Sequence, residues 1–134
     1  MISMKKRYLS IMLATVWIGL SEFLRNEFVL KNLWNTHYTQ LGLEFKTLPA
    51  NGILWLVWSF LLSLILHEIL QKFSIIKTIF LTWIMAFLMM WLVIYNLQVL
   101  PLQILLFAIP LSLIEIAIAI LIIKKITNNL YNRG

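Results

Sequence analysis

The chain has 134 residues, of which 62% are hydrophobic and 12% charged, with a net charge of +6 and a mean hydropathy of +0.92. A soluble domain carries about 25% charged residues, so this composition excludes an ordinary water-soluble globular protein. The chain contains no cysteine, which excludes disulfide bonds, thiolate catalysis and iron–sulfur ligation by its own side chains.

The first apolar segment predicts a membrane-spanning helix over about residues 8–30, directly after three basic residues at positions 5–7. A basic start before an apolar run is also typical of a secretory signal peptide. Residues 22–25 read Glu-Phe-Leu-Arg, however, where a signal peptide ends in small residues. We therefore interpret the segment as a span that is retained.

Residues 31–50 form the one sizeable segment outside the predicted spans, and the segment is apolar for a loop. Trp34, Tyr38 and Phe45 are among its large side chains, and aromatic rings of this kind favour the boundary between membrane and water. We expect a loop that lies along the outer membrane surface or folds over the end of the helices. Residues 49–52, Pro-Ala-Asn-Gly, predict the turn into the next span.

Three further spans are predicted over residues 51–70, 78–96 and 102–123. No Lys, Arg, Asp, Glu or His lies between Lys77 and Glu115, a stretch longer than the roughly 20 residues of one crossing. Gln98, Pro101 and Gln103 interrupt the middle of this stretch. It therefore divides into two helices joined by a tight turn.

The distribution of Lys and Arg among the connections predicts the orientation, because basic residues are retained on the cytoplasmic side. One side carries eight of them: Lys5, Lys6, Arg7, Lys72, Lys77, Lys124, Lys125 and Arg133. The other side carries Lys31 and Lys46, with Arg25 close to that interface. Both termini are predicted on the cytoplasmic side of a cell membrane, inner or plasma. Basic residues at span ends suit anionic lipid head groups, so we expect the lipid bilayer and no nucleic acid as a partner.

Each predicted span has a stripe of small and polar residues at helical spacing. Such stripes pack against one another in membranes, because the hydrophobic effect does not drive apolar faces together within lipid. The stripes are Thr15, Gly19, Glu22 and Asn26; Gly52, Leu56, Ser59, Ser63 and His67; Thr78, Thr82 and Ala86; and Ala108, Ser112, Glu115 and Ala119. We predict a single all-α domain over residues 1–134, an antiparallel four-helix transmembrane bundle with an interfacial outer loop.

Glu115 is the leading candidate for chemistry. It precedes Lys124 by nine residues, which places it roughly 13 Å from the inner interface, in one layer with Ser63 and Thr15. We expect these hydroxyls as its partners and no cation nearby. Removal from water favours the neutral carboxyl, so Glu115 either binds and releases a proton or acts as a neutral hydrogen-bonding link between helices.

Two further candidate sites lie toward the ends of the spans. Glu22 and Arg25, at positions i and i+3, are expected as an ion pair at the outer mouth of a cavity, or as part of a helix already in water. His67 shares a helical face with Ser63 and is expected either to pass protons inward or to be structural. The only other histidine, His37, is predicted on the opposite side, so no metal site is expected.

A resemblance rests on short motifs in the first half of the chain: His37-Tyr38, Leu41-Gly42-Leu43 with Phe45, and Asn51-Gly52 followed by Trp55, Trp58 and Ser59. In these motifs the chain resembles the small uncharacterised four-span proteins of bacterial inner membranes. The resemblance covers the first two spans. It implies the topology and attaches no activity to it.

The sequence contains no Gly-rich phosphate loop, nucleophile elbow or zinc motif, so neither a cofactor nor enzymatic activity is expected. We predict a non-enzymatic accessory or structural membrane component, whose partner is a larger membrane protein or a second copy of the chain. The alternative is a small transporter coupled to protons through Glu115. A membrane-embedded enzyme comes third, because no acid and base converge at one depth.

Overall fold

The computed structural model describes residues 3–46 and 48–128, and every regular element among them is a helix. Two of the elements, η1 and η2, are short π-helical segments, and η3 is a single 3-10 turn. In chain order the elements are α1 (Met4–Leu24), η1 (Arg25–Val29), α2 (Lys31–Gln40), α3 (Pro49–Leu70), α4 (Ile75–Trp83), η2 (Ile84–Leu88), α5 (Met89–Asn96), η3 (Leu102–Ile104) and α6 (Leu105–Asn128).

Four helical segments are long and apolar enough to cross a membrane, which confirms this part of the sequence prediction. They are Met4–Val29, Pro49–Leu70, Ile75–Asn96 and Leu102–Asn128. The first and the last extend beyond the predicted ranges, because the helices continue through the basic residues at positions 5–7 and 124–125. Hydropathy marks only the apolar part of a helix, whereas its backbone hydrogen bonds can continue into water.

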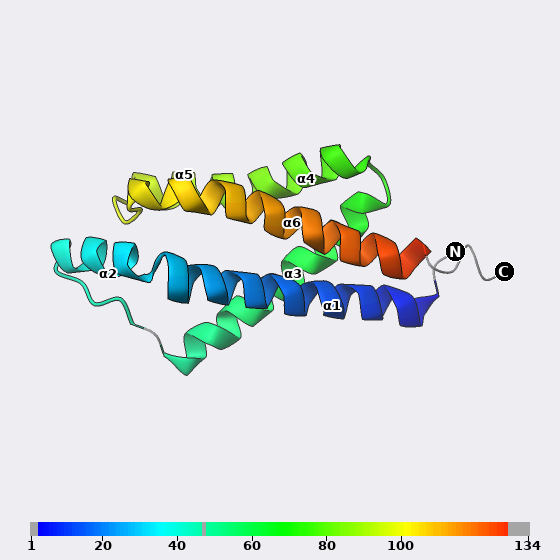
Figure 1. Ribbon diagram of the computed structural model, residues 1–134, viewed down its shortest axis with the longest axis horizontal. Coiled ribbons are helices and arrows are strands. Elements are labelled where there is room, and N and C mark those ends of the chain that lie inside the picture. Colours follow the sequence, from blue (N-terminus) through cyan, green and yellow to red (C-terminus); the bar gives the residue numbers. More distant parts are fainter. Residues whose placement is uncertain (1–2, 47, 129–134) are drawn as a thin grey trace.

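α1 and α6 lie side by side along the length of the molecule (Figure 1). α3 packs against α1, and α4 packs against α6. The first turn of α1 and the last turn of α6 lie at one end of the molecule, whereas α2 and the turn between α5 and α6 lie at the other (Figure 1). α1 and α6 therefore form the central pair that positions the candidate site.

Small and branched side chains fill the core between the helices. Ala14 and Ile18 of α1 are fully buried in one cluster with Ile116, Ala119 and Ile120 of α6. Alanine lets two backbones approach closely, which favours association of helices in lipid. The outward faces carry many large apolar side chains, and a water-exposed surface seldom carries so many. This distribution fits a protein that crosses a membrane several times.

The small-residue stripes predicted on α1 and α3 meet along only part of α3. Gly19 of α1 lies so close to α3 that an added Cβ would be 3.6 Å from the Oγ of Ser59. Ser59 and Ser63 are buried, whereas Gly52 of the same predicted stripe is exposed, together with the rest of the first two turns of α3. α3 therefore runs obliquely to α1 and separates from it at its N-terminal end (Figure 1).

The segment over residues 31–50 differs from the predicted loop, because half of it is the helix α2. α2 continues the course of α1 after the π-helical segment η1 (Figure 1). Phe45 then packs back on α2, with its ring centroid 5.9 Å from Trp34 and 5.1 Å from Tyr38. The aromatic residues that predicted an interface position therefore hold the segment against its own helix.

Two helix ends depend on a residue in the left-handed region. Gly42, whose φ is +71°, follows the C-cap of α2, and the N–H of Leu43 donates to the carbonyl of Tyr38 at 2.9 Å. Gln98, whose φ is +61°, follows the C-cap of α5 in the same way, and the N–H of Val99 donates to the carbonyl of Ile94 at 3.0 Å. Both are Schellman-type ends, and the second makes the tight turn into α6.

Candidate functional site

Three ionisable side chains meet in the interior between α1, η1 and α6, and we call Glu22, Arg25 and Glu115 the charge cluster. The Nη1 of Arg25 donates to the Oε2 of Glu115 at 2.9 Å, and its Nη2 pairs with the Oε1 of Glu22. The exposed fractions of the side chains are 7% for Arg25, 2% for Glu22 and 0% for Glu115. One guanidinium therefore joins two buried carboxyl groups, which in turn ties α1 to α6.

Neighbouring polar groups on α1 and η1 complete the contacts of the two carboxyl groups. Ser21 donates its hydroxyl to the Oε2 of Glu115 at 3.1 Å, and the indole N–H of Trp17 donates to the backbone carbonyl of Glu115 at 2.9 Å. The side-chain amide of Asn26 donates to the Oε2 of Glu22 at 3.2 Å. The Oε1 of Glu115 is buried and has no hydrogen-bond partner among the described residues.

A change in helix geometry places Arg25 at this point. The N–H of Leu30 donates to the carbonyl of Arg25 at 2.9 Å, an i to i+5 bond that closes the π-helical segment η1. The second π-helical segment, η2, carries Phe87, and the Cζ of Arg25 lies 5.3 Å from the centre of its ring. Both π-helical segments therefore contribute a residue to the guanidinium contact. π-Helical turns inside α-helices are frequent at functional sites.

The structure places Glu115 differently from the sequence prediction. The expectation that Glu115 has no cation nearby is wrong, because Arg25 contacts it. Thr15 and Ser63, its predicted partners, are buried but donate to the carbonyls of Ile11 and Ser59 on their own helices, at 2.8 and 2.9 Å. A hydroxyl on a helix readily reaches the carbonyl four residues earlier, so a shared depth alone did not bring these groups to the carboxyl.

Glu22 and Arg25, predicted at the mouth of a cavity or in water, are instead buried and belong to one cluster with Glu115. Depth counted from the basic residues at the helix ends separates the Glu22–Arg25 pair from Glu115, so the sequence predicts two sites. A signal for one site was present, since an arginine in a span is costly unless it finds carboxylates in the interior.

His67 lies elsewhere in the fold. It is buried near the C-terminal end of α3, where its Nδ1 lies 2.9 Å from the side-chain nitrogen of Gln71 and 3.5 Å from the Oε1 of Glu68. Glu68 forms an ion pair with Arg7, near the start of α1. Arg7 precedes Arg25 by 18 residues, or about 27 Å of helix, so His67 belongs to the opposite end of α1 from the charge cluster.

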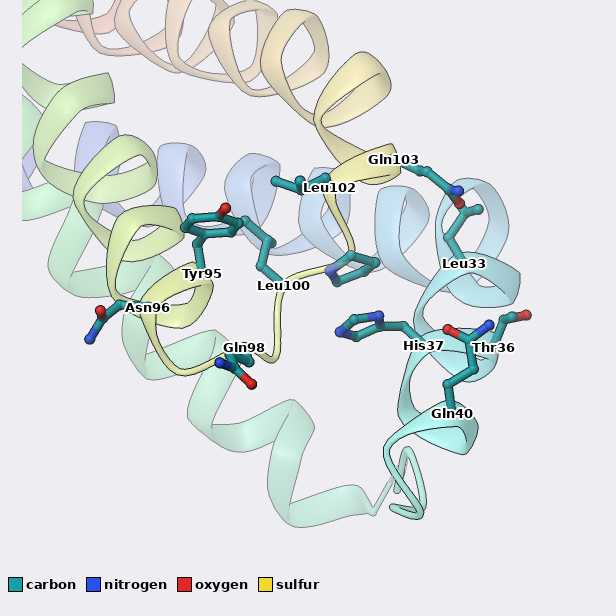
Figure 2. A pocket seen from close by; sticks show the side chains of 11 residues that line it. Leu33, Thr36, His37, Gln40, Tyr95, Asn96, Gln98, Leu100, Leu102 and Gln103 are labelled. Carbon is teal, nitrogen blue, oxygen red and sulfur yellow. The ribbon is translucent and has the colours of Figure 1, made fainter.

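A polar pocket of about 620 Å³ lies where α2 faces the turn between α5 and α6 (Figure 2). The Nε2 of His37 is buried without a hydrogen-bond partner among the described residues. The sequence does not predict this pocket, because Gln98 and Gln103 mark only a break between two helices there. The pocket is lined by Leu33, Thr36, His37, Gln40, Tyr95, Asn96, Gln98, Leu100, Pro101, Leu102 and Gln103.

An apolar groove of about 520 Å³ lies between α3 and the α4–η2–α5 segment. Three methionines, Met85, Met89 and Met90, contribute to its wall, and methionine adapts readily to the shape of a neighbour. Thr82 is the one hydroxyl residue of the lining, and its Oγ1 is buried without a partner among the described residues. The remaining lining residues are Trp58, Leu61, Leu62, Ile65, Ala86, Val93 and Ile94.

Comparison with known proteins found no matching family model, no matching curated protein and no matching solved structure. The resemblance to four-span inner-membrane proteins therefore stays a prediction.

Proposed function

We propose that the chain crosses a cell membrane four times as an antiparallel bundle, with the start of α1 and the end of α6 on the cytoplasmic side. The distribution of basic residues supports this orientation. Arg25 is paired with two carboxyl groups in the interior, so it is not one of the basic residues on the opposite side of the membrane. Lys31 and Lys46 alone remain there, and Lys31 pairs with Glu27 at 2.7 Å.

The chain contains no cysteine, so a single introduced cysteine is the only residue with which a maleimide reacts. This allows a direct test of the topology. Exposed Asn35 in α2 and exposed Phe73 between α3 and α4 are suitable positions. In intact cells a membrane-impermeant maleimide should label Asn35→Cys and should label Phe73→Cys only after lysis. The opposite pattern overturns the orientation, and equal labelling of both overturns the four crossings.

We propose further that the protein is a non-enzymatic accessory component of a larger membrane assembly. The observation that carries this proposal is the apolar groove between α3 and the α4–η2–α5 segment. Hydrogen bonds from Trp17, Ser21 and Arg25 join α1 and η1 to Glu115 of α6. α3 and the α4–η2–α5 segment instead leave the apolar groove between them, which suits a helix of another membrane protein.

A photocrosslinking amino acid at Met89, in the groove, tests this proposal in native membranes. The matched control is the same amino acid at Leu20, an apolar residue on the outer face of α1 that is similarly exposed, 50% against 56%. We expect Met89 to give a stoichiometric adduct with one larger membrane protein and Leu20 to give none. Adducts with lipid or with a second copy only, or the same adducts from both positions, contradict the accessory role.

A second candidate is a small proton-coupled transporter, and the observation that favours it is the pairing of two buried carboxyl groups with one arginine. Groups of this kind inside a membrane protein form proton and ion pathways. In proteoliposomes with an internal pH-sensitive dye, Glu115→Gln should abolish a proton flux that Glu27→Gln leaves intact. Absence of flux in the unaltered protein, or equal flux in all three proteins, removes this candidate.

A further inference from the structure

The charge cluster has an unbalanced count of ionisable groups. It contains one guanidinium and two carboxyl groups, and the exposed fraction of each side chain is below one tenth. If both carboxyl groups were ionised, the interior would hold one uncompensated negative charge. Burial of an unpaired charge is costly enough that a group takes up a proton instead. To be electrically neutral, the cluster therefore needs one additional positive charge.

The hydrogen bonds distinguish the two carboxyl groups. Both oxygens of Glu22 receive a donor, Oε1 from Arg25 and Oε2 from Asn26, as a buried carboxylate requires. Only Oε2 of Glu115 receives donors, from Arg25 and Ser21. The Oε1 of Glu115 is buried and accepts no hydrogen bond among the described residues. The hydrogen bonds of Glu22 therefore suit an ionised carboxylate, and those of Glu115 do not.

The remaining titratable groups on the elements packed against α6 lie away from Glu115. On α1 and η1 the groups that face it are Glu22 and Arg25, and the uncharged ring of Phe87 on η2 lies against Arg25. The titratable residues of α3 and α4 are His67, Glu68 and Lys77. Glu68 pairs with Arg7 near the start of α1, His67 adjoins it, and the Nζ of Lys77 lies 4.5 Å from the ring of Phe73. These side chains therefore make their contacts away from Glu115.

We propose that the charge cluster is a binding site for one dissociable proton, held on the Oε1 of Glu115 at neutral pH, with Glu22 ionised and Arg25 between them. Loss of the proton leaves two carboxylates on one guanidinium. The site then either recovers a proton or draws in another cation. A role for this proton in the cell depends on the proton-coupled transporter that we propose as the second candidate. The proposed site itself concerns binding at equilibrium, so it can hold or fail independently of any flux.

Infrared spectroscopy of the full chain in lipid tests the proposal, because a protonated carboxyl group has a C=O stretching band that a carboxylate lacks. The unaltered protein should show one such band at neutral pH, shifted in D₂O and lost at alkaline pH. Absence of the band, or its loss on addition of sodium at constant pH, overturns the proposal in favour of an ionised pair or a bound cation. This measurement needs no variant and so does not depend on how a substitution folds.

Three variants then locate the proton. The band should be absent in Glu115→Gln and present in Glu27→Gln, whose parent residue pairs with Lys31 outside the cluster. It should also be absent in Glu22→Gln, because Arg25 then balances an ionised Glu115. Retention of the band in Glu115→Gln places the proton on another residue. Retention in Glu22→Gln shows that burial alone, and not the charge count, keeps Glu115 protonated. Either result overturns the proposed site.

Discussion

Arg25 shows most clearly how one residue determines the interior of this protein. Its guanidinium contacts carboxyl groups on two elements and the ring of Phe87 on a third. The sequence predicted its pairing with Glu22, because the two residues are three apart on one helix. It did not predict the contact with Glu115, because 90 residues separate the two and no local pattern reports a contact of that range.

Replacement of Arg25 by glutamine should destabilise the protein strongly. Removal of one partner from a buried ion pair costs on the order of 3–5 kcal/mol, because the other partner is left uncompensated. The matched control is Lys31→Gln, since Lys31 is 43% exposed and pairs with Glu27, and an exposed pair is worth at most about 1 kcal/mol. Unfolding of both variants in detergent measures the difference. Equal losses of stability contradict a special role for Arg25.

At the scale of elements, the sequence predicted the helices well and their irregularities poorly. Apolar runs between charged residues locate the four long helices, because hydrocarbon excludes charge. The π-helical segments η1 and η2 carry no comparable signal, since a π-turn is a local change of backbone hydrogen bonding that the spacing of apolar residues does not report. The exposed first turns of α3 were also missed, because small residues such as Gly52 mark a possible contact face and not an actual one.

The two Schellman-type helix ends give opposite expectations for substitution. Gly42→Ala should destabilise the end of α2 by about 1 kcal/mol, because a Cβ disfavours the left-handed region. No atom lies within 4 Å of the added Cβ, so the cost comes from the backbone alone. Gln98→Gly should stabilise the end of α5 by a similar amount. Thermal unfolding, with amide hydrogen exchange at Leu43 and Val99, measures both, and shifts of the same sign would refute this explanation.

At the scale of the whole molecule, the pairing of α1 with α6 organises the fold. The predicted stripe on α6 is buried, and that on α1 and η1 is buried except for the half-buried Gly19 and Asn26. Small-residue spacing predicted a stripe on every span but not which two helices pair, because each stripe marks only a face that permits close backbone approach. It was also insufficient for the polar pocket, which forms only when α2 comes to lie beside the turn between α5 and α6.

A larger side chain in the core should weaken the packing of the molecule. Ala119 is fully buried, whereas Ala117 on the same helix is only partly buried. Ala119→Leu should lower the free energy of unfolding by about 1–3 kcal/mol through overpacking, and Ala117→Leu should lower it much less. Unfolding in detergent compares the two. A smaller effect at Ala119 than at Ala117 would show that α6 presents a different face to the bundle.

The hydrogen bond between the indole of Trp17 and the backbone carbonyl of Glu115 has a practical consequence. Indole emission responds to nearby electric fields, and this indole touches the residue whose charge is in question. In a chain that retains only this tryptophan, the wavelength of maximum emission should report the ionisation of Glu115. The protein can thus be titrated by its own fluorescence, without dye, label or transport assay.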